Sequence, residues 1–269
     1  AITHIRDRLQ QLKELQSRRQ SILDSLKERN ILTEELETRI LAAQTMTELE
    51  DIYLPYRPKR RTRAIIAREK GLQGLADLIL IQARTPADAQ KTAAGFLNEQ
   101  VTTIEDALAG ARDITAETIS EHADVRASTR RNAMQFGVLA SEKIEDAKDE
   151  KAVYETYYAF NAQVNRLRPH QVLAINRGEN EKVLRVKLTV EEKEWKSSMV
   201  DYFRPDLRSP FCNELEAALY DAAERLLLPA IERDVRRELT VAAETHAIKV
   251  FAANLKALLG QPPLAGHTV

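Results

Sequence analysis

The stretch that decides the fold is LEDIYLPYRPKRRTRAIIAREKGL, residues 49–72. Its acidic first part predicts a short helix that stops at Pro55, because a proline ring cannot continue a regular helix. Thr62 is a good N-terminal cap for a new helix, and Gly71 supplies the left-handed position that often ends one. The residues between the two helices are therefore expected to form a rigid loop.

This loop is strongly basic, with five cations within seven residues. Arginine forks match phosphate oxygens, and the Thr62 hydroxyl and the amides of the helix start can add donors. Tyr56, beside the cluster, could stack on a base or on an arginine. The candidate nucleic-acid-binding residues are Arg57, Lys59, Arg60, Arg61, Arg63 and Tyr56.

A structural interpretation of the same cluster weighs about equally. Glu48, Glu50 and Asp51 are close in sequence, and ion pairs with them would lock the loop against the scaffold. The two interpretations predict different behaviour. Phosphate contacts give sequence-independent binding that weakens with salt, whereas the loss of a structural ion pair lowers the melting temperature.

The order of residues 49–72 closely resembles the N-terminal region of bacterial Tex proteins, transcriptional accessory factors that share architecture with a eukaryotic elongation factor. Two further blocks are similar to the family, HQVLAINRGENEKVL at 170–184 and LPAIERDVRREL at 228–239 with AIKVFAANLKALLGQPPLAG at 247–266. Together they extend the resemblance over nearly the whole chain. One departure is Gln171, where family members commonly carry arginine, and a contact made by that arginine does not carry over.

The resemblance implies a large helical scaffold that holds a helix-turn-helix-like unit. In Tex proteins a RuvC-like domain, helix-hairpin-helix units and an oligonucleotide-binding domain follow, so the chain is expected to be a fragment. The full protein would bind nucleic acid, RNA or DNA, mainly through that absent C-terminal domain. RNA polymerase is a further expected partner.

Composition agrees with a helical protein, since 30% of residues are charged, 5% are aromatic and eight are glycine. The net charge of −1 excludes a global attraction to nucleic acid or membrane, so binding must come from local patches. Cys212 is the single cysteine, which excludes an intrachain disulfide. With no signal peptide and no apolar run long enough to cross a bilayer, the chain is expected to be cytoplasmic.

Catalytic patterns are missing from the sequence. It contains no phosphate-binding glycine loop, no HExxH, no CxxC and no GxSxG. Five scattered histidines and one cysteine do not make a zinc site of ordinary spacing. We therefore expect no catalytic residue, no metal, no cofactor and no enzymatic activity.

The predicted fold is mainly α, a multi-helix scaffold with long helices, a helix-turn-helix-like unit and one small β-hairpin. Apolar spacing predicts a helix over 5–29, and Thr33 predicts the start of a second helix. Thr47 with Glu50, the signal at 85–88, and the pair at 102–105 predict further helix starts in what looks like a series of short helices.

The hairpin is predicted from strands at 172–176 and 183–190, with turn formers at 177–181 between them. His170, Arg177 and Glu179 lie in this family-like block. We favour hydrogen bonds that fix the loop over ligand binding for these three residues. Trp195 and the pair at 202–203 are expected to cover the hairpin.

Tyr154, Tyr157 and Tyr158 would share one face of a helix, where packing in a core is favoured over stacking on bases. After Pro210 a long helical pattern runs to Gly260, with a kink or restart at Pro229. His246 lies on or beside its apolar stripe, so a core histidine is expected.

We divide the chain into five consecutive segments. They are an N-terminal helical segment at 1–61, a helix-turn-helix-like unit at 62–148, an aromatic and hairpin segment at 149–209, a helical spine at 210–260 and a linker at 261–269. Two functions remain open for them. One is nucleic-acid binding through the basic loop, and the other is a protein-interaction module that uses the long helices and the acidic stretch at 142–155.

Overall fold

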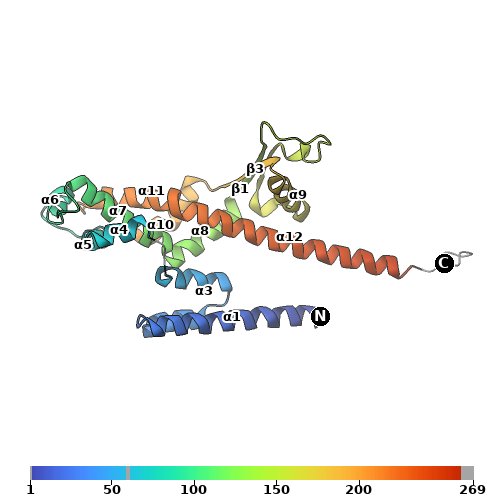
Figure 1. The fold of residues 1–269 in the computed structure, drawn as a ribbon, viewed down its shortest axis with the longest axis horizontal. Coiled ribbons are helices and arrows are strands. Elements are labelled where there is room, and N and C mark those ends of the chain that lie inside the picture. Colours follow the sequence, from blue (N-terminus) through green and yellow to red (C-terminus); the bar gives the residue numbers. More distant parts are fainter. Residues whose placement is uncertain (1, 59–60, 262–269) are drawn as a thin grey trace, which may run out of the picture. The chain divides into compact units, whose positions relative to one another are not determined.

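A computed structural model describes residues 2–58 and 61–261 of the chain (Figure 1). The described residues form two compact units, each built from two separate parts of the chain. Unit 1 takes the chain up to Thr129 together with Lys196–Leu228, and unit 2 takes Arg130–Trp195 together with the chain from Pro229. The predicted, mainly helical fold is confirmed, and in place of the predicted β-hairpin it holds a three-stranded antiparallel sheet. The division into five consecutive segments stays a prediction.

The first helices of unit 1 share a small core of their own (Figure 1). Thr33 caps the second helix as predicted, because its hydroxyl accepts a hydrogen bond from the Leu36 amide. The predicted Thr47 cap is wrong. Thr45 is the extended residue before the third helix, and its hydroxyl accepts from the Glu48 amide at 3.1 Å. These elements are α1 (Ile2–Glu28), α2 (Glu34–Ala42), α3 (Met46–Tyr53) and the 3-10 turn η1 (Leu54–Tyr56).

The rest of unit 1 packs around one long helix, α7 (Ile104–Glu121), with small residues along its buried side. A Cβ atom on Gly110 would lie 2.4 Å from Leu72 Cδ1, so only glycine allows this close packing. The other elements here are α4 (Arg63–Glu69), α5 (Gln73–Leu80), α6 (Ala89–Ala94), α11 (Cys212–Asp221) and the π-helical η4 (Ala222–Leu227). Helices α8 (Ala123–Phe136) and α10 (Glu192–Phe203) contribute to both units.

Most start and stop signals in this part of unit 1 are confirmed. The Thr62 hydroxyl caps α4, the Asp88 carboxylate caps α6, and Gly71 has a φ of +83°. The cap of α7 is Thr103 and not Thr102, since the Thr103 hydroxyl accepts from the Asp106 amide. The helix-turn-helix-like unit remains a prediction.

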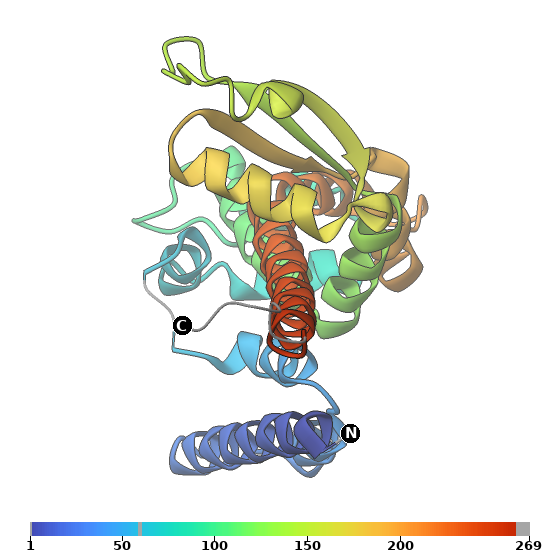
Figure 2. The ribbon, with the colours of Figure 1, turned by 90° about the vertical axis from the view of Figure 1, so that its right-hand side faces the viewer.

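Unit 2 holds a three-stranded antiparallel sheet of order β2-β1-β3, made of β1 (Val138–Lys143), β2 (Ala159–Gln163) and β3 (Leu184–Thr189). The helix α9 (Pro169–Asn180) packs against β3 (Figure 2). The predicted strand at 172–176 is therefore wrong, because Val172 and Ile175 are buried three residues apart on α9. A short apolar run alone does not separate a strand from a buried helix. The predicted strand at 183–190 is confirmed.

The tyrosine cluster belongs to a core, as favoured, but not to an α-helix. Tyr154 is buried with Val183 and Leu184, and Tyr157 and Tyr158 pack against them. Tyr157 ends a 3-10 turn, η2 (Glu155–Tyr157), and a second such turn, η3 (Val164–Arg166), follows β2.

The last helix is α12 (Leu228–Leu259). Pro229 is its second residue, and the π-helical η4 ends directly before it, which confirms an interruption at this proline. The predicted core position of His246 is wrong, since this side chain is exposed. Among the described helices, none combines the length and the apolar character that crossing a membrane requires.

Candidate nucleic-acid interface

The basic loop joins the end of η1 to the start of α4. Arg57 and Arg63 are exposed. Arg61 is also exposed and donates to Glu69 at 3.0 Å. Lys59 and Arg60 lie outside the described residues. The described members of the cluster therefore place their charges at the surface, next to the capped end of a helix.

Tyr56 is held more firmly than its neighbours. Its ring is half-buried against the core shared by α1, α2 and α3. Its carbonyl oxygen accepts a hydrogen bond from the Arg29 guanidinium. This packing fixes the point from which the basic loop departs.

The acids expected to lock the loop are bound to other groups. Glu50 accepts from Arg18 Nε at 2.6 Å, and Asp51 accepts from Arg126 Nε at 2.6 Å. Glu48 accepts from the backbone amide of Gln44 at 2.8 Å. The phosphate-binding and the structural interpretation of the cluster both stay predictions.

Two basic residues on α4 have different surroundings. Arg68 donates to the buried Glu117 at 2.8 Å and so ties α4 to α7. Arg63 remains exposed, but its charge reaches Asp113 on α7. Burial raises the pKa of the Asp113 carboxyl, and the positive charges of Arg225 and Arg63 oppose that rise. Arg68 is thus a structural arginine, while Arg63 stays available at the surface.

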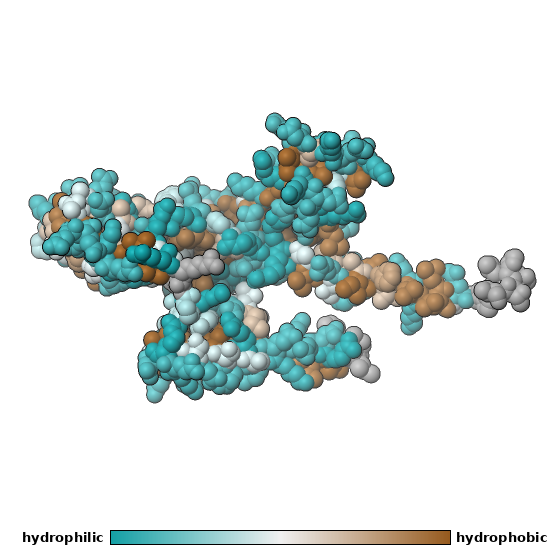
Figure 3. Space-filling model, in the orientation of Figure 1, coloured by the Kyte–Doolittle hydropathy of each residue, from teal (hydrophilic) through white to brown (hydrophobic). Residues whose placement is uncertain are grey.

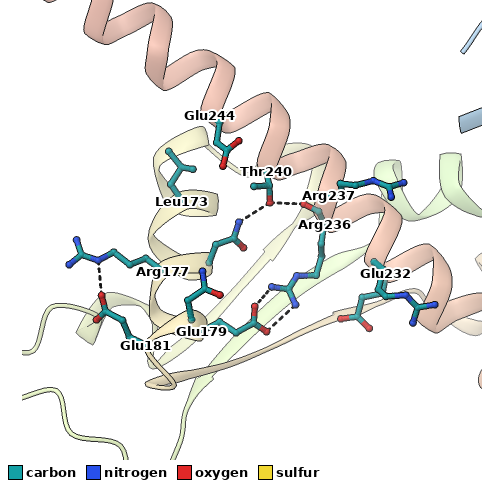
Figure 4. A pocket seen from close by; sticks show the side chains of 12 residues that line it. Leu173, Arg177, Glu179, Glu181, Glu232, Arg236, Arg237, Thr240 and Glu244 are labelled. Carbon is teal, nitrogen blue, oxygen red and sulfur yellow. Dashed lines mark hydrogen bonds and ion pairs between the residues drawn. The ribbon is translucent and has the colours of Figure 1, made fainter. Parts of the chain in front are cut away.

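A second arginine-rich site is the groove of about 690 Å³ between α9 and α12 in unit 2 (Figure 4). Arg236 of α12 makes a two-fold ion pair with Glu179 of α9. Asn176 Nδ2 donates to Thr240 Oγ1 at 2.8 Å, which joins the same two helices. The charges that line this groove compensate one another. They are Arg177, Arg233, Arg236 and Arg237 against Glu179, Glu181, Glu232 and Glu244.

The groove shows which groups the polar residues of the family-like block at 170–184 contact. The predicted loop at 177–181 is wrong, because α9 runs to Asn180. Glu179 accepts from Arg236 of α12 and so joins two helices, while Arg177 donates to Glu181 at 2.9 Å in an exposed pair. His170 is exposed at the start of α9. Sequence reasoning missed the partners Asn176 and Arg236. Their place inside the two family-like blocks was the available signal.

Close packing explains why residue 178 in this block is a glycine. A Cβ atom there would lie 2.6 Å from Leu184 Cδ1 and 3.0 Å from Tyr154 Cδ1. The residue therefore lets α9 pack closely on the tyrosine core, and it is not part of a turn.

The second half of α12 carries an exposed apolar surface (Figure 3). The first half is anchored, since Ile231 and Val235 have no exposed surface. Further along, Ile248 is 69% exposed and Phe251 is 68% exposed. Ile248, Phe251, Leu255 and Leu258 follow one another at spacings of three and four residues, so these exposed side chains share one side of the helix. Such a stripe is typical of a helix that packs against another element.

Comparison with known proteins identifies relatives along the whole chain. Residues 84–251 match the family model described as Tex central region-like. The chain is 38% identical over 288 residues to Protein tex of Bordetella pertussis, and this alignment covers 100% of the chain and 36% of that protein. It is 33% identical over 270 residues to the transcriptional accessory protein Tex of Neisseria gonorrhoeae, with 97% and 35% covered.

A more distant similarity joins the chain to a human protein. It is 26% identical over 293 residues to the human S1 RNA-binding domain-containing protein 1, covering 100% of the chain and 28% of that protein. The chain therefore spans about a third of the length of the curated relatives that it matches.

Proposed function

The chain belongs to the Tex family, and we propose that its basic loop, residues 57–63, binds the phosphate backbone of nucleic acid without reading sequence. The rest of the chain serves as the scaffold that presents the loop. The observation that carries this proposal is the position of the acids. Glu48, Glu50 and Asp51 are occupied by other groups, while Arg57, Arg61 and Arg63 stay exposed.

The chemistry suits a backbone contact. Exposed guanidinium groups match phosphate oxygens in charge and in geometry. The name of the human relative, which refers to RNA binding, agrees with a nucleic-acid partner for the whole protein. We propose binding, with no catalysed reaction.

The test is binding of the 269-residue chain to labelled single-stranded RNA, single-stranded DNA and duplex DNA across a salt series, measured by fluorescence anisotropy. The test variant carries Arg57→Gln, Arg61→Gln and Arg63→Gln. We expect the parent chain to bind with a clear salt dependence. In the variant, the slope of log K against log salt should fall by about 0.7 per lost contact to a single strand.

The matched control removes the same charge elsewhere. Arg177, Arg185 and Arg237 are 70%, 71% and 70% exposed, close to the 72% of Arg61. Arg177 and Arg185 each pair with an exposed carboxylate as Arg61 does, and Arg237 pairs with the half-buried Asp234. Their triple change to glutamine should leave the salt slope unchanged. Equal losses in both variants would show a general charge effect, and no binding by the parent chain would overturn the proposal.

The exposed half of α12 favours a second candidate function, a protein-interaction module of the transcription machinery. Its surface includes Ile248, Phe251 and Leu255, which are 69%, 68% and 44% exposed. We expect the chain to retain RNA polymerase in a pull-down after nuclease treatment, and the variant Ile248→Ser with Phe251→Ser to lose it. Loss of polymerase from the parent chain after nuclease would contradict this candidate.

A further inference from the structure

The two outer strands of the sheet in unit 2 differ in how their free edges are protected. The strand β3 carries the charged residues Arg185 and Lys187, and the Leu188 amide donates to Glu232 of α12 at 2.9 Å. The strand β2 reads AFNAQ and has neither a charged residue nor a proline. Natural sheets usually guard an open edge with charges, prolines, bulges or a covering element.

The hydrogen bonds at both ends of β2 show which of its backbone groups point outward. The Lys143 amide donates to the Tyr158 carbonyl at 3.1 Å, and the Val164 amide donates to the Gly137 carbonyl at 2.8 Å. In an antiparallel pair, residues alternate between facing the partner strand and facing away. Phe160 and Ala162 therefore face β1 with their backbone groups.

The three remaining residues of β2 face away from β1. They are Ala159, Asn161 and Gln163, and all three are exposed. Within the described part of the chain, no hydrogen bond to their backbone amides or to the carbonyls of Ala159 and Asn161 is found. The Gln163 carbonyl is the start of the 3-10 turn η3, so the row offers three donors and two acceptors, about 7 Å from one outward residue to the next.

The side chains next to this row suit a partner with alternating character. Phe160 is half-buried and makes an edge contact with Tyr157, with ring centroids 5.4 Å apart. It shares one sheet face with Ala162, while Asn161 lies on the other face. A strand placed beside β2 would thus meet an apolar surface on one face and an amide on the other.

We propose that the edge of β2 binds an extended peptide segment of a partner protein by strand addition. Only a strand presents donors and acceptors that alternate at the spacing of Ala159, Asn161 and Gln163. The bound segment has apolar residues at alternate positions, packed beside Phe160 and Ala162, and polar residues between them. The residues of the bound segment that lie beside β2 are uncharged, because β2 itself carries no charge.

The test selects phage-displayed random seven-residue peptides for binding to the full 269-residue chain. The Asn161→Pro variant is added in excess as a competitor, so that peptides which bind outside the β2 edge are removed. Proline removes the central outward amide and is tolerated at a strand edge. We expect enriched peptides with alternating apolar residues, and binding to the variant weakened by at least about tenfold. Hydrogen exchange of the Asn161 and Gln163 amides should slow on peptide binding, while that of Phe160 stays the same.

Two further variants keep the test decisive. If Asn161→Pro melts earlier than the parent chain, Asn161→Lys replaces it, because a charge guards the edge without touching the backbone. Thr189→Lys is the matched control, since Thr189 is exposed on β3 and its backbone faces β1.

Three results would overturn the proposal. In one, the selection enriches no peptide that prefers the parent chain to the edge variants. In another, the selected peptides bind Asn161→Pro or Asn161→Lys as tightly as they bind the parent chain. The third is a dimeric mass for the free chain with slow exchange at Asn161, because a second copy would then occupy the edge.

Discussion

The arginines of the α9–α12 groove and those of the basic loop have the same chemistry but different neighbours. In the groove, Arg236 of α12 binds Glu179 of α9 and so joins two helices, whereas the exposed pair of Arg177 and Glu181 joins none. In the loop, Arg57 is exposed and Arg61 has one exposed carboxylate partner. Positions of carboxylates therefore decide whether a run of arginines joins helices or stays open to a ligand.

The largest effect is expected where an ion pair is most deeply buried. Arg126 and Asp51 are 8% and 5% exposed. Arg126→Ala would leave the Asp51 carboxylate without its main counter-charge, and we expect a loss of about 3–5 kcal/mol in the free energy of unfolding. Urea denaturation measures it. The double variant Asp51→Leu with Arg126→Met should recover most of the lost free energy of unfolding. A loss below about 1 kcal/mol for Arg126→Ala would contradict the interpretation as a buried ion pair.

A smaller effect is expected in the α9–α12 groove. Glu179→Ala removes the partner of the half-buried Arg236, and we expect a loss of about 1–2 kcal/mol in the free energy of unfolding. Glu181→Ala is the control, because its pair with Arg177 is largely exposed and should contribute less than about 0.5 kcal/mol. Equal losses in the free energy of unfolding, measured by urea denaturation, would contradict the expectation that the half-buried pair stabilises the protein more than the exposed pair.

The basic loop should contribute little to stability. We expect the variant Arg57→Gln, Arg61→Gln and Arg63→Gln to change the free energy of unfolding by less than about 0.5 kcal/mol, because exposed ion pairs are weak. Urea denaturation beside the anisotropy measurement separates binding from folding. A variant that unfolds much more easily would identify the loop as a structural clasp.

A pH effect is expected from the junction of α7 and α8. His122 packs against the rings of Tyr202 and Phe203, and its buried Nδ1 has no hydrogen-bond partner among the described residues. Burial lowers the pKa of the His122 imidazole, and the charge of Arg39 acts in the same direction against that of Asp124. The unfolded chain therefore takes up this proton at a higher pH than the folded chain.

The stability that the neutral ring contributes is present above pH 6.5, the ordinary pKa of histidine, and is lost as the pH falls below it. Melting temperatures at pH 8 and pH 5 measure the loss. His122→Gln should make the difference between the two pH values smaller. An unchanged difference would show that other groups cause it.

Local signals in the sequence were reliable where the interaction spans a few residues. Thr33 and Thr62 cap their helices as predicted, because a capping side chain reaches an amide only three residues away. The start signal at 85–88 lies directly before α6, whose cap is Asp88. The errors at Thr47 and Thr102 are shifts of one or two residues among neighbouring threonines. Several residues there could cap equally well, and only packing selects among them.

For the candidate site, too, the features made by neighbouring residues were predictable and the contacts between distant residues were not. The basic cluster and its helix start are visible in the sequence, because they need only adjacent residues. The partners that occupy Glu50 and Asp51 were not predictable, since Arg18 and Arg126 lie 32 and 75 residues away. The ion pairs that distinguish the loop from the groove are therefore a property of the tertiary structure.

By itself, the sequence determined a mainly helical chain, its main start and stop signals, and its resemblance to the Tex family. Only the tertiary structure decided the sheet, because β1 pairs with β3 through residues more than about 40 positions apart, for which the chain carries no local signal. It also decided that Ile231 is buried while Ile248 on the same helix is exposed. Apolar spacing marks the residues able to be buried, but burial requires a neighbouring element.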